Sequence, residues 1–99
     1  MKQIAIAIKE PNKPIQMVNT TGELEDLQKI VGGYLEYIPF ENGMLLWCNE
    51  EGKLLDLQPN FGYHNDIIVG TVFFSRDNRK CEIASLKVDD IVYLRRMFG

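Results

Sequence analysis

The sequence predicts an α+β domain, in which a mainly antiparallel sheet of about five to seven strands carries two helices packed on it. Strand-like segments follow one another in hairpin-like pairs. Only two segments have the spacing of an amphipathic helix, a pattern that does not fit a doubly wound parallel fold. With 99 residues, 45% of them hydrophobic and 25% charged, the chain has the size and composition of a single globular domain, residues 1–99.

The first two predicted strands form a hairpin. Isoleucine and alanine alternate over residues 3–8, which is the period of a strand. Residues 15–19 are a second β-rich run. The two prolines and the asparagine between these runs predict a turn that lets the strands pair.

The first helix is predicted to follow residues 20–23. The hydroxyl of Thr20 and the carboxylate of Glu23 have the spacing of a capping box, in which each side chain bonds the backbone N–H of the other residue. Gly32 and Gly33 end the helix, because glycine adopts the left-handed C-terminal conformation without steric cost. Between these signals, apolar residues recur at helical spacing: Leu24, Leu27, Ile30 and Val31.

A second hairpin is predicted from two β-rich runs, residues 34–40 and 44–48. The Asn42-Gly43 pair between them favours a tight turn with positive φ at both positions. Pro39 has no backbone N–H, so we expect it at the end of its strand or on an edge strand.

The next part of the chain is predicted to contain its longest irregular segment. Residues 54–57 are expected to form a short strand. Residues 58–66 are expected to form a loop, because polar and aromatic residues follow one another there with little periodicity. Residues 67–75, the most apolar run, predict a central strand in which Gly70 marks a bulge or a close backbone approach. Residues 76–79 then turn the chain.

A strand over residues 80–84 and a helix over residues 86–98 complete the prediction. Ser85 is the expected N-cap of this helix. Its charges match the helix dipole, with acidic residues in the first turns and basic residues in the last: Asp89, Asp90, Arg95 and Arg96.

Charge and composition narrow the classes of function. A net charge of −3 repels a phosphate backbone on average, which disfavours nucleic-acid binding; the cluster of Arg76, Arg79 and Lys80 is the local alternative. No signal peptide and no membrane span is visible, so the sequence predicts a cytoplasmic protein with no membrane partner. Cys48 and Cys81 are expected to be reduced and buried, with a disulfide between them as the alternative.

No catalytic or metal-binding constellation is recognisable, so we expect no enzymatic activity, no metal and no cofactor. His64 is the only histidine, and with two cysteines it supplies too few ligands for a structural zinc site. A Cys48–His64 nucleophilic pair is conceivable, but Cys48 lies in an apolar strand, where an inert buried thiol is expected. Adjacent carboxylates are expected to be solvated and not to form acid–base dyads: Glu50-Glu51 and Asp89-Asp90.

The candidate ligand-binding site is the segment from Asn49 to Asp66. It concentrates side-chain amides, charges and rings with polar tips, which suit a planar polar ligand because rings stack while amides donate and accept. The alternative is that the amides serve the turns and Tyr63 covers the core. The predicted contacts, including an arginine from the turn at 76–79, are Asn49, Lys53, Asn60, Tyr63, His64, Asp66 and Arg76.

Several short motifs together resemble a known family. They are Val31–Pro39, Asn42–Met44, Asn49–Leu54, Pro59-Asn60 and Asp66–Val72. This string is similar to a family of small domains of unknown function, encoded largely by bacteriophages, plasmids and other mobile elements of bacteria. The resemblance covers roughly residues 30–75 and implies an α+β domain of mobile-element origin without a known reaction. Matching positions are Asn49, Gly52, Lys53, Asn60, Asp66 and Gly70, whereas residues 61–65, with Tyr63 and His64, have no counterpart in the motif.

Two functions from different classes are expected. The first is a phage or mobile-element protein that antagonises host defence by sequestering a nucleotide-derived signal, with Lys53 and Arg76 on phosphate and Tyr63 as the stacking surface. The second is a protein-binding inhibitor or adaptor that acts on a host defence or DNA-processing protein. Its anchors would be exposed aromatic residues: Tyr34, Tyr37 and Phe40. For either function we expect a homo-oligomer in the host cell cytosol, because a single small core leaves a thin margin of stability.

Overall fold

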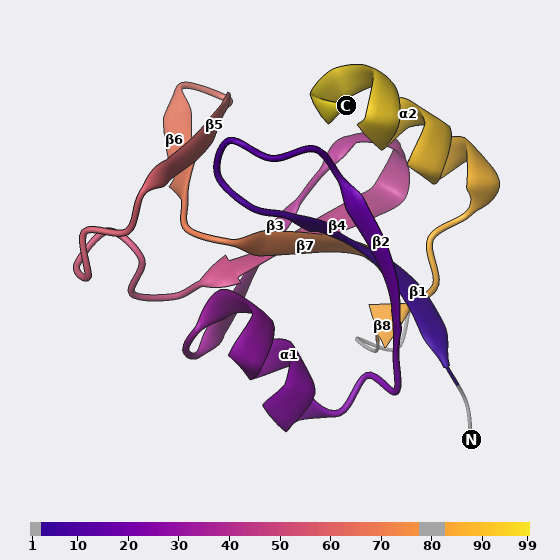
Figure 1. Ribbon diagram of the computed structural model, residues 1–99, viewed down its shortest axis with the longest axis horizontal. Coiled ribbons are helices and arrows are strands. Elements are labelled where there is room, and N and C mark those ends of the chain that lie inside the picture. Colours follow the sequence, from indigo (N-terminus) through magenta and orange to yellow (C-terminus); the bar gives the residue numbers. More distant parts are fainter. Residues whose placement is uncertain (1–2, 78–82) are drawn as a thin grey trace.

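The computed structural model describes residues 3–77 and 83–99, which form a main sheet, a small second sheet and two helices (Figure 1). In chain order the elements are β1 (Ile4–Lys9), β2 (Gln16–Thr20), α1 (Leu24–Val31), β3 (Leu35–Pro39), the 3₁₀ turn η1 (Glu41–Gly43), β4 (Met44–Asn49), β5 (Pro59–Tyr63), β6 (Asp66–Val69), β7 (Val72–Asp77), β8 (Ile83–Ala84) and α2 (Val88–Phe98). The predicted α+β class is confirmed.

The main sheet has the strand order β2-β1-β7-β4-β3, with β8 paired to β7. Every pairing in it is antiparallel. β7 occupies the centre, as expected for the most apolar run, and its first four residues are all buried. β2 and β3 are the two ends of the strand order, so Pro39 ends an edge strand, as its missing N–H predicts.

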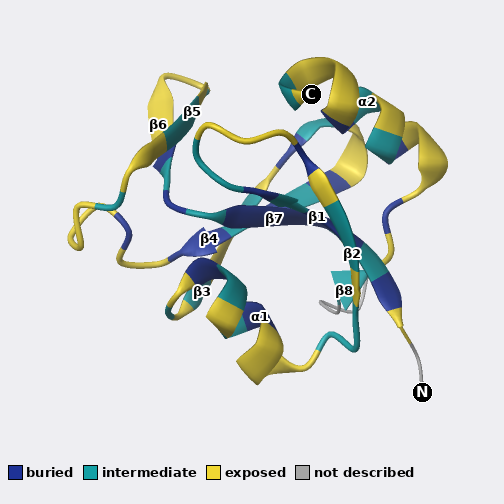
Figure 2. Ribbon diagram, in the orientation of Figure 1, coloured by how far each residue is buried: buried dark blue, intermediate teal, exposed yellow. Residues whose placement is uncertain are grey.

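Two layers cover the main sheet. Helix α1 lies on one face, and α2 with the β5–β6 hairpin lies on the other (Figure 1). The adjacent residues Phe73 and Phe74 of β7 point to opposite faces, so Phe73 packs with Leu27 of α1 and Phe74 packs with Leu94 of α2. Figure 2 shows the buried residues following β7 through the middle of the fold. The structure therefore has two cores that share one central strand.

The predicted strand 67–75 is two strands, and the expected bulge at Gly70 is wrong. β6 belongs to the second sheet and β7 to the main sheet, and Gly70 lies between them with a φ of 77°. The expected close backbone approach is confirmed, because the Gly70 N–H donates to the Gln58 carbonyl at 2.7 Å. A Cβ on Gly70 would also lie 2.7 Å from Leu57 Cδ1. Hydrophobicity is continuous across Gly70, so only the pairing partners reveal that the chain changes sheets.

The predicted loop at residues 58–66 and the predicted strand at 54–57 are both wrong. β5 and β6 form an antiparallel hairpin that turns at His64 and Asn65, both with positive φ. Residues 54–56 lie in a turn instead, with Leu54 84% exposed. The hairpin was missed because its strands are short and β5 does not alternate between apolar and polar residues.

Both predicted helix caps are wrong in detail. The N-cap of α1 is Glu23, and the Thr20 hydroxyl accepts from the Gly22 N–H at 3.2 Å. The N-cap of α2 is Lys87, while the Ser85 hydroxyl accepts from the Ala5 N–H at 2.9 Å and ties this segment to β1. Ser and Thr hydroxyls bond several backbone geometries, so sequence spacing alone does not select the cap.

Several other local predictions are confirmed. β1 and β2 pair as a hairpin. Asn42 and Gly43 both have positive φ, at 60° and 81°. Gly32 ends α1 in the left-handed conformation with a φ of 79°. The turn predicted at 76–79 is wrong for its first two residues, which belong to β7.

Some predictions fall on residues 78–82, outside those that the structure describes. They are the end of the turn at 76–79, most of the strand at 80–84, and the environment of Cys81 with its alternative disulfide. Among the described residues, neither helix is long and apolar enough to cross a membrane.

Candidate functional site

The structure distributes the seven predicted contact residues over four places. A groove beside β6 is lined by Asn49, Lys53 and Asp66. Tyr63 and His64 lie at the turn of the β5–β6 hairpin. Asn60 lies in β5 against β1, and Arg76 lies beside the start of α2. The sequence segment is therefore not one site.

The groove has a volume of about 180 Å³ and lies between edge strand β3, the end of β4, the turn after β4, and β6. We call it the β3–β6 groove. Glu36 and Ile38 of β3 both reach it, because residues two apart in a strand share a face. Its lining residues are Glu36, Ile38, Cys48, Asn49, Glu50, Gly52, Lys53, Leu54, Asp66, Ile67, Ile68 and Val69.

Asn49 lies in the wall of the groove, but its polar atoms serve the fold. Its Nδ2 donates to the Val31 carbonyl at the end of α1 (3.2 Å), and its Oδ1 accepts from the Glu51 N–H (2.8 Å). Gly33 packs so closely against this amide that a Cβ there would lie 2.7 Å from Nδ2. Both ends of the buried amide are occupied, which favours the alternative that the amides serve the turns.

Lys53 and Asp66 form an ion pair that joins the turn after β4 to the start of β6. The Asp66 carboxylate also accepts from the Ile67 N–H at 2.8 Å. The hydrogen bond from Lys53, followed by that from the Ile67 backbone, holds the pKa of Asp66 below its ordinary value. The predicted phosphate contact Lys53 therefore already has an anionic partner inside the protein.

The described lining of the β3–β6 groove is acidic. Glu36, Glu50 and Asp66 contribute three carboxylates, and Lys53 contributes the one lysine or arginine side chain. Burial, followed by the charges of Glu36 and Asp66, raises the pKa of the Cys48 thiol to about 11. A thiol with that pKa is protonated at neutral pH and is a poor nucleophile. The groove suits a cationic ligand better than an anionic one.

Tyr63 and His64 form a separate corner with Glu41. The Tyr63 hydroxyl donates to Glu41 Oε1 at 3.2 Å, and His64 Nε2 lies 3.8 Å from the same oxygen. Burial, followed by the charge of Glu41, raises the pKa of Tyr63. Neither ring lines the β3–β6 groove.

Phe40 is not the exposed anchor that was predicted. It is buried, with ring centroids 4.7 Å from Tyr63 and 4.9 Å from Phe74. Its backbone N–H also bonds the Met44 carbonyl, which closes the hairpin. The other two predicted anchors, Tyr34 and Tyr37, are exposed as expected.

Asn60 fastens the β5–β6 hairpin to the main sheet. Its Nδ2 donates to the carbonyls of Lys9 and Gly70, each at 2.8 Å, and its Oδ1 accepts from Lys9 Nζ at 3.1 Å. Lys9 is buried, and this burial lowers the pKa of its amine. The side chain of Asn60 is fully engaged by the protein itself.

Replacing Asn60 by alanine is expected to lower the free energy of unfolding by about 2–4 kcal/mol, because two carbonyls lose a donor and the buried Lys9 ammonium keeps only its bond to the Glu10 carbonyl. Urea denaturation measures this. Asn19→Ala is the matched control, since Asn19 is exposed on edge strand β2, and it should change stability by less than about 0.5 kcal/mol. Equal effects of the two substitutions would show that the Asn60 network does not hold the hairpin.

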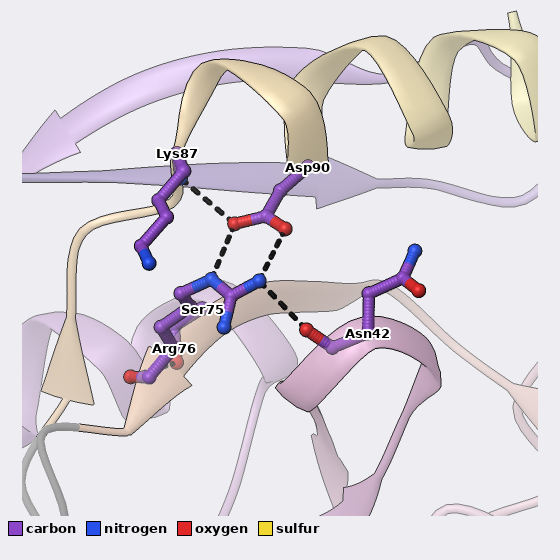
Figure 3. A network of polar contacts seen from close by, with 5 residues as sticks. All are labelled: Asn42, Ser75, Arg76, Lys87 and Asp90. Atoms are coloured by element: carbon purple, nitrogen blue, oxygen red, sulfur yellow. Dashed lines mark hydrogen bonds and ion pairs between the residues drawn. The ribbon is translucent and has the colours of Figure 1, made fainter.

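Arg76 lies in a polar network at the start of α2 (Figure 3). Its Nε donates to Asp90 Oδ2 at 2.6 Å and its Nη2 to Asp90 Oδ1 at 2.7 Å, a bidentate ion pair. Nη2 also donates to the Asn42 carbonyl at 2.6 Å, and Asp90 accepts from the Lys87 N–H at 2.8 Å. The expectation that Asp90 is solvated is therefore wrong: its side chain is 2% exposed.

The register of the sheet keeps Arg76 away from the groove. Arg76 lies opposite Met44 at the start of β4, whereas the groove residue Asn49 ends the same strand. Five residues of strand separate these positions by roughly 17 Å. Arg76 and Lys53 therefore do not converge on one phosphate.

The predicted contacts leave out nine of the twelve residues that line the groove, among them Glu36, Leu54 and Ile67. Glu36 alternates with Leu35 and Tyr37, a signal that places it on the other face of its strand but does not show what covers that face. The sequence predicts Leu54 and Ile67 in strands, where apolar side chains are usually buried, but both are exposed. Within residues 3–77 and 83–99, no three side chains of His, Cys, Asp or Glu converge as a metal site would require.

Comparison with known proteins gives a family but no functional precedent. The family described as Domain of unknown function (DUF3846) matches residues 1–99. No curated protein matches significantly. No solved structure matches significantly.

Proposed function

Because the chain belongs to the DUF3846 family of domains of unknown function, we propose its function from its own geometry: it is a binding module that holds a basic segment of another protein in the β3–β6 groove. The observation that carries this proposal is the charge of the groove. Three carboxylates line it against one ammonium, and that ammonium is already paired with Asp66. A lysine or arginine side chain of a partner complements the two remaining carboxylates, Glu36 and Glu50.

Apolar side chains beside the groove support a protein partner. Leu54 and Ile67 line it and are exposed, and Leu55 next to Leu54 is exposed as well. Two exposed rings lie close by: Tyr34 just before edge strand β3, and Tyr37 within β3 on the opposite face of the sheet. Protein interfaces typically have an apolar centre and a polar rim, and aromatic residues such as tyrosine are enriched among the anchors that carry most of the affinity.

Sequestration of a nucleotide-derived signal stays a prediction that the geometry supports less well. The polar atoms of Asn49, Asn60 and Arg76 are engaged within the protein. The groove, at about 180 Å³, is smaller than the roughly 300–1,000 Å³ of pockets that enclose small molecules and cofactors.

The proposal extends to origin and target. The resemblance to domains of mobile elements supports a phage or mobile-element protein, and the partner would then be a basic surface of a host defence or DNA-processing protein in the host cytosol. Such surfaces are rich in lysine and arginine because they bind nucleic acid. A homo-oligomer remains part of the proposal, and the native mass of the purified protein reports it.

Charge neutralisation at the groove tests the binding module. Glu36→Gln/Glu50→Gln removes two lining charges, and Glu23→Gln/Glu25→Gln removes the same number from exposed positions at α1. We expect immobilised wild-type protein and the α1 control to retain a basic protein from bacterial lysate, and the groove variant to retain at least tenfold less. Retention by the wild type should also fall as salt rises.

Two outcomes would contradict the proposal. Equal retention by the groove variant and the α1 control would remove the groove from the interaction. The second outcome comes from calorimetry with a panel of cyclic and linear nucleotides: binding of a nucleotide by the wild type, with no protein retained, would replace the proposal by sequestration of a signal.

A further inference from the structure

We infer that the outer edge of β3 receives the basic segment as an added antiparallel strand, so that the partner's side chains alternate between the β3–β6 groove and the opposite face of the sheet. This inference rests on the proposed function and specifies how that function is carried out. It commits to one occupant, an extended segment in which basic and apolar residues alternate.

The outer edge of β3 is open along the described chain. β3 pairs with β4 on one side, and no strand within residues 3–77 and 83–99 pairs with it on the other. A sheet edge with unpaired N–H and C=O groups is a template for an added strand. The opposite edge, β2, does not contribute to the groove.

The pattern of backbone hydrogen bonds shows which groups point outward. Phe40 N–H bonds the Met44 carbonyl, and Glu50 N–H bonds the Tyr34 carbonyl. Because paired residues alternate in an antiparallel ladder, the even-numbered residues of this stretch bond β4 and the odd-numbered ones face away. The outward groups are therefore the N–H and C=O of Leu35 and Tyr37, and the C=O of Pro39.

The proline at position 39 limits the added strand. Pro39 lies where an outward N–H would otherwise stand, so it offers an acceptor but no donor. Two-way exchange of hydrogen bonds is thus confined to Leu35 and Tyr37. The partner segment is short, and residues directly opposite these two exchange both bonds with them.

The alternation of side chains along a strand determines which partner sequence fits beside β3. Partner residues opposite Leu35 and Tyr37 lie on the α1 face, where Tyr37 is 56% exposed and its ring lies 5.3 Å from Trp47. Apolar side chains suit that face. Partner residues opposite Glu36 and Ile38 lie on the groove face, where the carboxylates of Glu36 and Glu50 favour lysine or arginine.

A second copy of this chain is a poorer occupant of the same edge. Antiparallel pairing of β3 with β3 of another copy would bring the two Glu36 carboxylates, and the two acidic grooves, close together. Like charges opposite one another in a sheet destabilise the pairing. Charge complementarity therefore favours a basic segment of a different protein.

N-methylated peptides test the inference. The probe is a short capped peptide in which lysine and valine alternate, with binding measured by fluorescence polarisation. In the inferred register the valine N–H groups point at β3 and the lysine N–H groups point away. N-methylation of the valines should weaken binding at least tenfold, whereas N-methylation of the lysines should change it less than threefold. A peptide of the same composition with its lysines and valines in separate blocks should bind at least tenfold more weakly.

The outcomes separate this inference from the proposed function. Equal binding of both methylated peptides, with loss of binding in Glu36→Gln/Glu50→Gln, would overturn edge pairing and leave the acidic groove as the binding site. Loss on lysine methylation alone would overturn the antiparallel register. No binding of any alternating peptide would overturn the inference, and retention of a basic protein from lysate by the same preparation would show that the proposed function survives. A native mass that doubles in the wild type and not in Tyr37→Pro, which removes an outward N–H, would place a second copy on the edge and overturn it as well.

Discussion

Replacing Arg76 by methionine is expected to lower the free energy of unfolding by about 3–5 kcal/mol at neutral pH, because it leaves a buried carboxylate without its counter-charge. Asp90 is 2% exposed and accepts two hydrogen bonds from Arg76. Methionine keeps most of the length of arginine, so the loss reports the missing charge and not a large cavity. Urea denaturation measures the difference.

The effect of Arg76→Met should depend on pH with a defined sign. Burial alone would raise the pKa of Asp90, but the hydrogen bonds from Arg76 and the Lys87 N–H outweigh it and hold the pKa below the ordinary 3.8. A depressed folded-state pKa gives stability that is present above 3.8 and is lost as the pH falls through the folded value. In Arg76→Met, only the contacts with Lys87 oppose the rise in the pKa of Asp90 that burial causes. Protonation of Asp90 in acid therefore stabilises the variant relative to the wild type. The difference between the two proteins should therefore be largest near neutral pH and shrink toward pH 3.8.

The double variant Arg76→Met/Asp90→Leu is the control for this prediction. It removes both charges, so no unpaired ion stays buried, and we expect it to be more stable than Arg76→Met at neutral pH and nearly insensitive to acid at this site. It still lacks the contact from Asp90 to the Lys87 N–H, which costs about 0.5–2 kcal/mol as a lost helix cap. A double variant as unstable as Arg76→Met would mean that packing, and not the ion pair, fastens α2 to β7.

Replacing Gly70 by alanine is expected to lower the free energy of unfolding by about 2–5 kcal/mol, the sum of a strained positive φ and an overpacked contact. Gly70 has a φ of 77°, and its Cβ would lie 2.7 Å from Leu57 Cδ1. Because this residue carries the chain from β6 to β7, the loss should be accompanied by faster amide exchange in the β5–β6 hairpin.

Gly32→Ala separates the two causes. Gly32 has a similar φ of 79°, but a Cβ there would meet nothing within 4 Å, so only the backbone strain of about 1–2 kcal/mol is expected. In Gly70→Ala/Leu57→Ala the contact is relieved, and a double-mutant cycle should show coupling of about 0.5–3 kcal/mol. Equal losses of unfolding free energy in Gly70→Ala and Gly32→Ala would show that the Leu57 side chain moves aside without an energetic penalty.

Local signals predicted the parts of the fold that depend on near neighbours. The alternation of Ile4, Ile6 and Ile8 places the first strand, and positive φ at Asn42 and Gly43 places the turn before β4. Gly32 ends α1 for the same local reason. In each case the interacting atoms lie within a few residues of one another, so the sequence window contains the whole cause.

The candidate site could be predicted only in part, because its members have partners far away in the chain. Asn60 and Arg76 have the chemistry of ligand contacts, but Lys9 and Asp90 occupy them, and those partners are 51 and 14 residues away. Lys53 and Asp66 do meet, as a segment of amides and charges suggested, yet their meeting neutralises the cation. The residue types therefore indicated which side chains can make polar contacts, but not which partners they contact in the folded protein.

The sequence by itself determined the α+β class, the first hairpin, the edge position of Pro39 and the buried thiol of Cys48, because hydrophobic periodicity and backbone restrictions act over a few residues. Only the tertiary structure decided that residues 67–75 divide at Gly70 between two sheets, and that Glu36, Glu50 and Asp66 face one groove. The hydrophobic pattern of a strand shows that one of its faces is covered, but it does not show which element covers it. The charge of a groove is the sum of the charges on several segments, and only long-range pairing brings those segments together.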